Sequence, residues 1–178
     1  MNLFVTHTDP LEAAKGFDDK RVGKLLMEAN QLLSMAVMCH VPKAEWVYLV
    51  GPGMLTFQSH EKHPVSLWVQ QSKAHYWWTL RHALALGWEF EYRFGKDHMS
   101  AERTRFILRQ KYHYAMPDHG PIMEFQNSAR NTHVDCTTLA VPQSYQIYLN
   151  ARWFMDKNPV KFTRRKPPVW AHKEHIEP

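Results

Sequence analysis

The sequence has few cysteines and no apolar run long enough to cross a membrane. Its two cysteines, Cys39 and Cys136, stand outside any paired motif, which excludes a zinc-finger spacing and argues against a disulfide framework. No stretch of about 18 apolar residues occurs, so we expect no association with a membrane. The N-terminal residues also lack the charged start and apolar stretch of a signal peptide. A cytoplasmic protein is therefore expected.

The motifs of several common enzyme classes are also missing. The sequence contains no glycine-rich dinucleotide loop, no Walker lysine loop and no G-x-S-x-G elbow, so nucleotide-cofactor and serine-hydrolase chemistry have no local support. It has 12 histidines but no H-E-x-x-H motif, and His60-Glu61-Lys62-His63 is the nearest approach to a ligand cluster. We expect no cofactor and no metal.

Charge and aromatic content favour a polyanionic partner. The 178 residues include 22 Lys and Arg against 17 Asp and Glu, a formal charge of +5, which promotes association with nucleic acid. Seven tryptophans are more than one core of this size needs, so some are expected at the surface. Exposed rings beside cations can stack bases, although an aromatic-rich core or a protein interface would have the same composition.

Periodicity predicts a mainly α, single-domain, helical bundle-like fold. Residues 2–6 look like a short β-like segment, Asp9 and Pro10 begin a first helix, and Asp19 is the expected cap of a stronger helix over about residues 20–39. Residues 41–62 are expected to be mostly loop. We assign residues 1–156 to a helical core and residues 157–178 to a basic tail containing proline and tryptophan, packed on the core or extending from it.

The second half of the core is divided by proline and glycine. His63-Pro64 begins a helical segment of about 30 residues that ends at Gly95, with a break expected near Ser72 or Gly87. Ser100 is the expected cap of the next helix, residues 121–141 have no clear period, and Pro142 begins the last helix.

The first candidate site is the polar side of the helix over residues 20–39. Its members are Asp19, Lys20, Arg21, Lys24, Glu28 and Gln31. A solvated helix face has this pattern in most proteins. In a functional interpretation, Lys24 is a base, an amine nucleophile or a phosphate ligand, Glu28 is a general acid or base, and Gln31 bonds a base edge.

The second candidate site lies on the long helical segment. His75, His82, Glu89 and Arg93 share one face beside Trp78, and Lys96 and His98 follow the helix end. A core-facing side that carries these groups either borders a cleft or forms an internal ion-pair network, because unpaired burial is costly. Both interpretations fit the spacing.

The third candidate site is the tail. Arg164, Arg165 and Lys166 form a run of positive charge, and Trp170 follows as a stacking ring. A disordered basic end is the alternative. The tryptophan favours a docked segment, because solvated tails seldom contain one.

One set of residues follows the pattern of a known family. They are Asn2 to Val5, Asp9-Pro10, Ala13-Ala14, Asp19 to Val22, Lys24, Glu28, Gln31 to Leu33, His63-Pro64, Trp68, Tyr76, Trp78, Glu89, Arg93, Gly95-Lys96 and His98, with a looser similarity at Tyr145, Tyr148, Trp153, Pro168 and Trp170. In these residues the sequence resembles a family of small bacteriophage and bacterial proteins, some of which are labelled pyrimidine-dimer DNA glycosylases. The resemblance implies phage DNA metabolism in the host cytoplasm. It also leaves room for enzymes that hypermodify pyrimidines in phage DNA, which need a similar base pocket without excision.

The leading hypothesis is a nucleic-acid enzyme that acts on a pyrimidine base of DNA, by base excision or base modification. Its expected catalytic residues are Lys24, Glu28, His82 and Glu89, brought together across a cleft. The expected substrate-binding residues are Asp19, Lys20, Arg21, Gln31, His63, His75, Trp78, Arg93, Lys96 and His98. The alternatives are a non-catalytic DNA-binding or host-interaction protein and a nucleotide-binding enzyme; the oligomeric state stays open.

Overall fold

The computed structural model describes residues 1–48 and 60–176, with side chains described for 1–45 and 60–176. Its α-helices are α1 (Pro10–Lys15), α2 (Asp19–His40), α3 (Pro64–Gln71), α4 (Lys73–Phe94), α5 (Met99–Gln110) and α6 (Gln143–Met155). Short 3-10 turns are η1 (Lys43–Tyr48), η2 (Tyr112–Ala115) and η3 (Lys173–His175). The mainly helical fold expected from the periodicity is confirmed.

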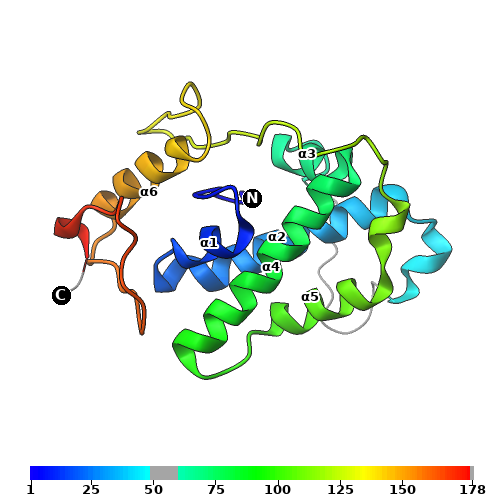
Figure 1. The fold of residues 1–178 in the computed structure, drawn as a ribbon, viewed down its shortest axis with the longest axis horizontal. Coiled ribbons are helices and arrows are strands. Elements are labelled where there is room, and N and C mark those ends of the chain that lie inside the picture. The colour runs from blue at the N-terminus through cyan, green and yellow to red at the C-terminus, as the bar shows by residue number, and fades with distance from the viewer. Residues whose placement is uncertain (49–59, 177–178) are drawn as a thin grey trace.

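Helices α2 and α4 form the centre of the molecule. Both have 22 residues, and they pack against each other, with α1 and α5 also against α4 and α3 against both (Figure 1). The apolar stripe of α2 supplies Leu25, Leu26, Leu32 and Leu33, all at most 2% exposed. Burial of such side chains contributes about 1.5–3 kcal/mol each, which explains why α2 occupies the middle of the fold.

The predicted long helical segment is broken at Ser72 and not at Gly87. The Ser72 hydroxyl accepts a hydrogen bond from the backbone N–H of His75 at 3.2 Å and so begins α4 directly after the end of α3. Gly87 lies inside α4, and its missing side chain lets α5 approach closely, since a Cβ there would lie only 3.1 Å from that of Ala101. Gly95 ends α4 as expected, at a φ of 65°.

The N-terminal segment is not the β-like strand expected from the sequence. Residues 1–5 have no regular secondary structure, and Phe4 has a φ of 49°. The local hydrogen bonds go to side chains: the N–H of Asn2 donates to Glu28 at 2.8 Å, and the N–H of Phe4 donates to the Asn2 side chain at 3.2 Å. Side-chain acceptors thus replace a strand partner.

Two helix caps also differ from the prediction. Asp18, not Asp19, caps α2, because its carboxylate accepts the N–H groups of Lys20 and Arg21. His98, not Ser100, caps α5 through a bond from the N–H of Ser100 to its Nδ1 at 3.1 Å. The capping carboxylate therefore sits one residue earlier than expected, which leaves the side chain of Asp19 free for tertiary contacts.

The C-terminal part of the chain lies at one end of the molecule. The irregular segment after η2 runs back along the molecule to α6, which lies with the chain end beside the N-terminal segment (Figure 1). Residues 157–176 contact the core: Trp170 stacks on Trp153 with centroids 5.4 Å apart. Within this segment, Val160 forms a bridge with Ile176. The predicted loop over residues 41–62 includes η1, but its residues 49–59 lie outside the described part of the chain.

None of the helices in the described ranges combines the length and the apolar composition that crossing a membrane requires.

Candidate nucleic-acid interface

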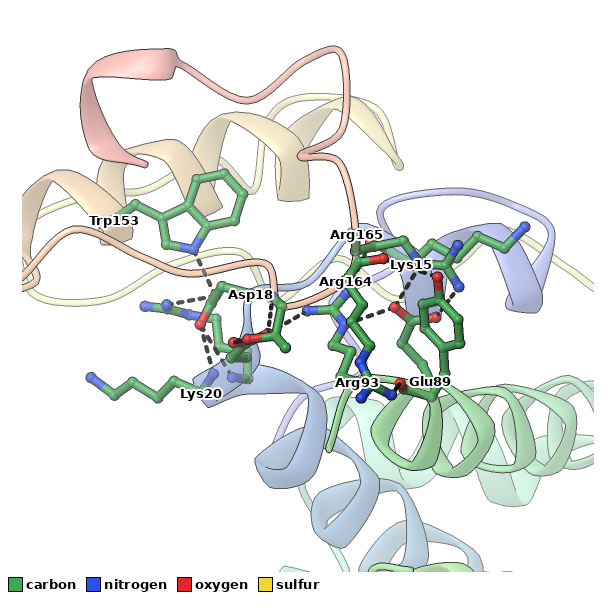
Figure 2. A network of polar contacts seen from close by, with 12 residues as sticks. Lys15, Asp18, Lys20, Glu89, Arg93, Trp153, Arg164 and Arg165 are labelled. Carbon is green, nitrogen blue, oxygen red and sulfur yellow. Dashed lines mark hydrogen bonds and ion pairs between the residues drawn. The ribbon is translucent and has the colours of Figure 1, made fainter. Parts of the chain in front are cut away.

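The start of α2 is bound to α6 by a buried carboxylate. Asp18 is 1% exposed, and besides capping α2 it accepts hydrogen bonds from Arg21 at 2.8 Å and from the indole N–H of Trp153 at 2.7 Å (Figure 2). Arg21 also donates to Asp156 at 2.9 Å. Arg21 is therefore 7% exposed and takes part in the contact between α2 and α6. Lys20 stays exposed, and its amine lies 3.3 Å from the carboxylate of Asp156.

Asp19 connects α2 with α4 and with the C-terminal segment. Its carboxylate accepts hydrogen bonds from the buried guanidinium of Arg93 at 3.0 Å and from both the N–H and the hydroxyl of Thr163, at 3.0 and 2.6 Å. The N–H of Asp19 donates to the Lys161 carbonyl at 2.9 Å. This residue joins the α2 and α4 stripes.

Glu89 is shared by two arginines. Arg93 donates to one of its oxygens at 2.7 Å, and Arg165 from the C-terminal segment forms a bidentate pair at 2.9 and 2.7 Å (Figure 2). Burial alone would raise the pKa of Glu89, but the two guanidinium groups outweigh it and hold that pKa below its ordinary value. Glu89 is thus an ionised structural anchor, 4% exposed.

A groove of about 650 Å³ opens beside this network, between α1, α6 and the C-terminal segment. We call it the basic groove. It is lined by Thr6, His7, Glu12, Lys15, Gly16, Gln146, Arg164, Arg165, Lys166, Pro168, Val169 and Trp170. Four cationic side chains therefore meet one carboxylate, that of Glu12, which pairs with Lys15 at 2.7 Å.

Aromatic side chains flank the basic groove. Tyr92 of α4 donates its hydroxyl to the Arg164 carbonyl at 3.0 Å, and the Arg165 guanidinium lies 4.5 Å from the centre of its ring. Trp88, one helical turn before Tyr92, is 56% exposed. Trp170 lines the groove, and its ring stacks on that of Trp153. Exposed rings beside cations are the arrangement that binds unstacked bases and phosphates.

A second group of polar residues surrounds the middle of α2. Glu28 has a side chain 13% exposed, accepts the N–H of Asn2, and has an oxygen 3.8 Å from the amine of Lys24, whose side chain is 60% exposed. The His63 imidazole lies within electrostatic reach of Glu28, and burial lowers its pKa, which favours the neutral ring. Gln31, the expected reader of base edges, is 6% exposed.

Two predicted substrate-binding histidines are helix caps. His63 accepts the N–H of Val65 at 3.2 Å at the start of α3, as His98 does for α5. This role needs an unprotonated Nδ1, and burial lowers the pKa of both rings. Lys96 is exposed in the turn between α4 and α5.

Three predicted site residues of α4 are buried, namely His75, Trp78 and His82. His75 stacks on Trp68 and accepts the N–H of Met123, so its Nδ1 carries the proton and donates to the Trp68 carbonyl at 2.8 Å. His82 is fully buried against Trp78, and burial lowers its pKa to about 4. Trp78 donates to the Thr8 carbonyl at 2.7 Å. These three side chains form an internal layer.

The predicted cleft residues thus fall into separate places. Among the described residues, no hydrogen bond or ion pair connects Lys24 or Glu28 with His82 or Glu89. No family model, curated protein or solved structure matches this chain.

Several residues of the network were not expected from the sequence. These residues, whose contacts are with partners far along the chain, are Asp18, Thr163, Asp156 and Tyr92. Asp18, for example, accepts its hydrogen bond from Trp153, 135 positions away. Only Asp18 had a local signal, because an aspartate two residues after Gly16 is a good cap for the helix that follows. Lys15 could have been noticed as a cation at the end of α1.

Proposed function

We propose that the protein binds the phosphate backbone of a nucleic acid, expected to be DNA, in the basic groove. The observation that carries this proposal is the convergence of Lys15, Arg164, Arg165 and Lys166 on one cavity. Phosphate contacts of this kind supply most of the affinity of proteins for nucleic acids. The rings of Trp170 and Tyr92 support the proposal, because Trp170 lines the groove and Tyr92 contacts Arg165, so both offer surfaces for bases next to the cations.

The four cations differ in how free they are to meet a phosphate. Arg165 is held by both oxygens of Glu89, so two of the five N–H donors of its guanidinium are already used. Arg164 and Lys166 are exposed, and the Arg164 guanidinium donates a hydrogen bond to the Tyr92 carbonyl at 3.1 Å. These two side chains are therefore expected to make the phosphate contacts, while Arg165 holds the segment in place.

The test is a binding titration over a salt series with fluorescently labelled oligonucleotides, single-stranded and duplex. The double variant Arg164→Gln/Lys166→Gln should bind more weakly, and its dependence of log K on log salt should flatten by about 1.4–1.8, because each lost phosphate contact removes about 0.7–0.9 of slope. The matched control is Lys43→Gln/Arg109→Gln, which removes the same charges from exposed positions outside the groove. If log K depended equally on log salt in both double variants, the proposal that the groove binds phosphate would be wrong.

A second candidate function is catalysis on a pyrimidine base, by excision or modification, at Lys24 and Glu28. The observation that favours it is the grouping of an exposed amine, a partly buried carboxylate and a neutral imidazole, those of Lys24, Glu28 and His63. An amine can attack a sugar carbon and a carboxylate can transfer the proton, which are the groups that glycosidic cleavage needs. The resemblance to proteins labelled pyrimidine-dimer glycosylases agrees with this chemistry.

Glu28→Gln separates this candidate from simple binding. The amide oxygen can still accept the N–H of Asn2, so the fold and the oligonucleotide affinity should be retained. Turnover of a duplex that contains a thymine dimer should fall by about 100-fold, the usual effect of removing a general acid or base. A parent protein that binds the duplex but never changes it would eliminate catalysis on this lesion and leave the binding proposal intact.

A further inference from the structure

A turn near the C-terminus brings together two imidazoles and a carboxylate. His172, Glu174 and His175 each offer one ligand atom, and these three atoms lie within 4.8 Å of one another. The Glu174 oxygen is 3.7 Å from Nδ1 of His172 and 4.0 Å from Nε2 of His175. None of these residues belongs to the basic groove or to the α2 group.

The backbone of this turn is fixed at both ends. The N–H of His172 donates to the Asn150 side chain at 2.8 Å, and the carbonyl of His175 accepts the N–H of Val160 at 2.9 Å. The His175 ring is 11% exposed and lies edge-on to Phe154, with centroids 5.5 Å apart. Only the side chains of His172 and Glu174, 60% and 69% exposed, need to reorient to bind an ion.

We propose that His172, Glu174 and His175 form a binding site for a divalent transition metal of the zinc type. Two imidazole nitrogens and one carboxylate oxygen are a ligand set that zinc accepts, with a fourth position left open. Zinc–ligand bonds of about 2.0–2.2 Å place tetrahedral ligand atoms about 3.4 Å apart. The Glu174 oxygen, 3.7 and 4.0 Å from the two imidazole nitrogens, must therefore approach them by about 0.3 and 0.6 Å. Since the three ligand atoms lie within 4.8 Å of one another, the widest separation must shorten by about 1.4 Å or less.

The open position would face a cavity. A groove of about 650 Å³ is lined by both histidines together with His133, Phe154 and Trp170. It therefore holds a further imidazole, that of His133, and an apolar wall. This site was not expected from the sequence, where His60 and His63 were the nearest approach to a ligand cluster, and in the structure His63 caps α3.

The experiment is a titration of the full chain, made without a polyhistidine tag, with zinc chloride by calorimetry and with Co²⁺ by visible absorption. We expect one equivalent of tight binding and a higher melting temperature with metal, because an ion that binds only the folded state stabilises it. Loss of one ligand in His172→Ala should weaken binding by about 100-fold or more, since even changes behind the ligands cost 10–100-fold.

Glu174→Gln and His172→Ala change exposed side chains, so both variants should fold like the parent. The matched control is His119→Ala, which removes an exposed histidine from the irregular segment after η2. Absence of zinc binding by the parent chain would overturn the proposal. So would binding that Glu174→Gln and His172→Ala leave unchanged, or that His119→Ala weakens equally, because the ion would then be held elsewhere.

Discussion

Replacing Glu89 by glutamine tests whether the α4 stripe is an internal ion network. Glu89 is 4% exposed and faces two guanidinium groups, one of which, that of Arg93, is fully buried. A glutamine at this position has nearly the same shape but one oxygen acceptor in place of two. Its amide N–H₂ would point at guanidinium donors, and Arg93 would keep only Asp19 as a charged partner.

The expected cost follows from the burial of the pair. Removing one member of a buried ion pair typically costs about 3–5 kcal/mol, because the other charge is left uncompensated. Glutamine still accepts one hydrogen bond, so we expect the lower end of that range, about 3 kcal/mol. For a chain of this size each kcal/mol lowers the melting temperature by about 2–4 °C, which gives a fall of about 6–12 °C.

Urea unfolding at neutral pH measures this effect directly. The control is Glu12→Gln, which breaks the exposed pair with Lys15 and should cost less than about 1 kcal/mol. A Glu89→Gln protein as stable as the parent would refute the reasoning. If such a stable variant also lost about 100-fold in rate on a substrate of the parent, Glu89 would be a catalytic acid or base and not an anchor.

Two further predictions concern the stability of the buried core. Burial lowers the pKa of His82 from 6.5 to about 4. Between these two pH values the imidazole is protonated in the unfolded chain but neutral in the folded protein, so protons favour unfolding. The contribution of His82 to the free energy of unfolding is therefore complete above pH 6.5 and declines by about 1.4 kcal/mol per pH unit as the pH falls towards 4. Urea unfolding at pH 7.5 and 5 should show the decline, His82→Asn should reduce it, and a flat profile for the parent would contradict it. Trp153→Phe removes the indole hydrogen bond to Asp18 and should cost about 1.5–3 kcal/mol in the same assay, whereas Trp88→Phe at an exposed position should cost less than about 0.5 kcal/mol.

The helices could be predicted from the sequence because their signals are local. Pro10 and Pro64 begin α1 and α3, Ser72 divides the long segment, and Gly95 ends α4. Each of these positions acts through its own backbone geometry or a hydrogen bond to a residue two or three positions away. No tertiary information was needed for them.

The candidate sites were less predictable because burial depends on distant partners. Glu89 and Arg93 pair at i,i+4 as the spacing allowed, but the pair is interior only because Asp19 and Arg165 close over it. The spacing of His75 and His82 likewise does not indicate that their imidazoles are buried in the core. There they form hydrogen bonds with the backbone carbonyls of Trp68 and Pro10. The sequence pattern of a charged stripe on a helix is the same whether water or another segment of the chain covers the stripe.

The contacts that hold the C-terminal segment also determine when the basic groove can exist during synthesis. Asp19 meets Thr163 across 144 positions, and Glu89 meets Arg165 across 76. A growing chain that has not yet reached Thr163 has already made α1, α2 and α4, but it holds two carboxylates without their late partners and has none of the cations from 164 to 166. The groove is therefore among the last parts of the molecule to form, so an incomplete chain on the ribosome still lacks the surface that we propose to bind nucleic acid.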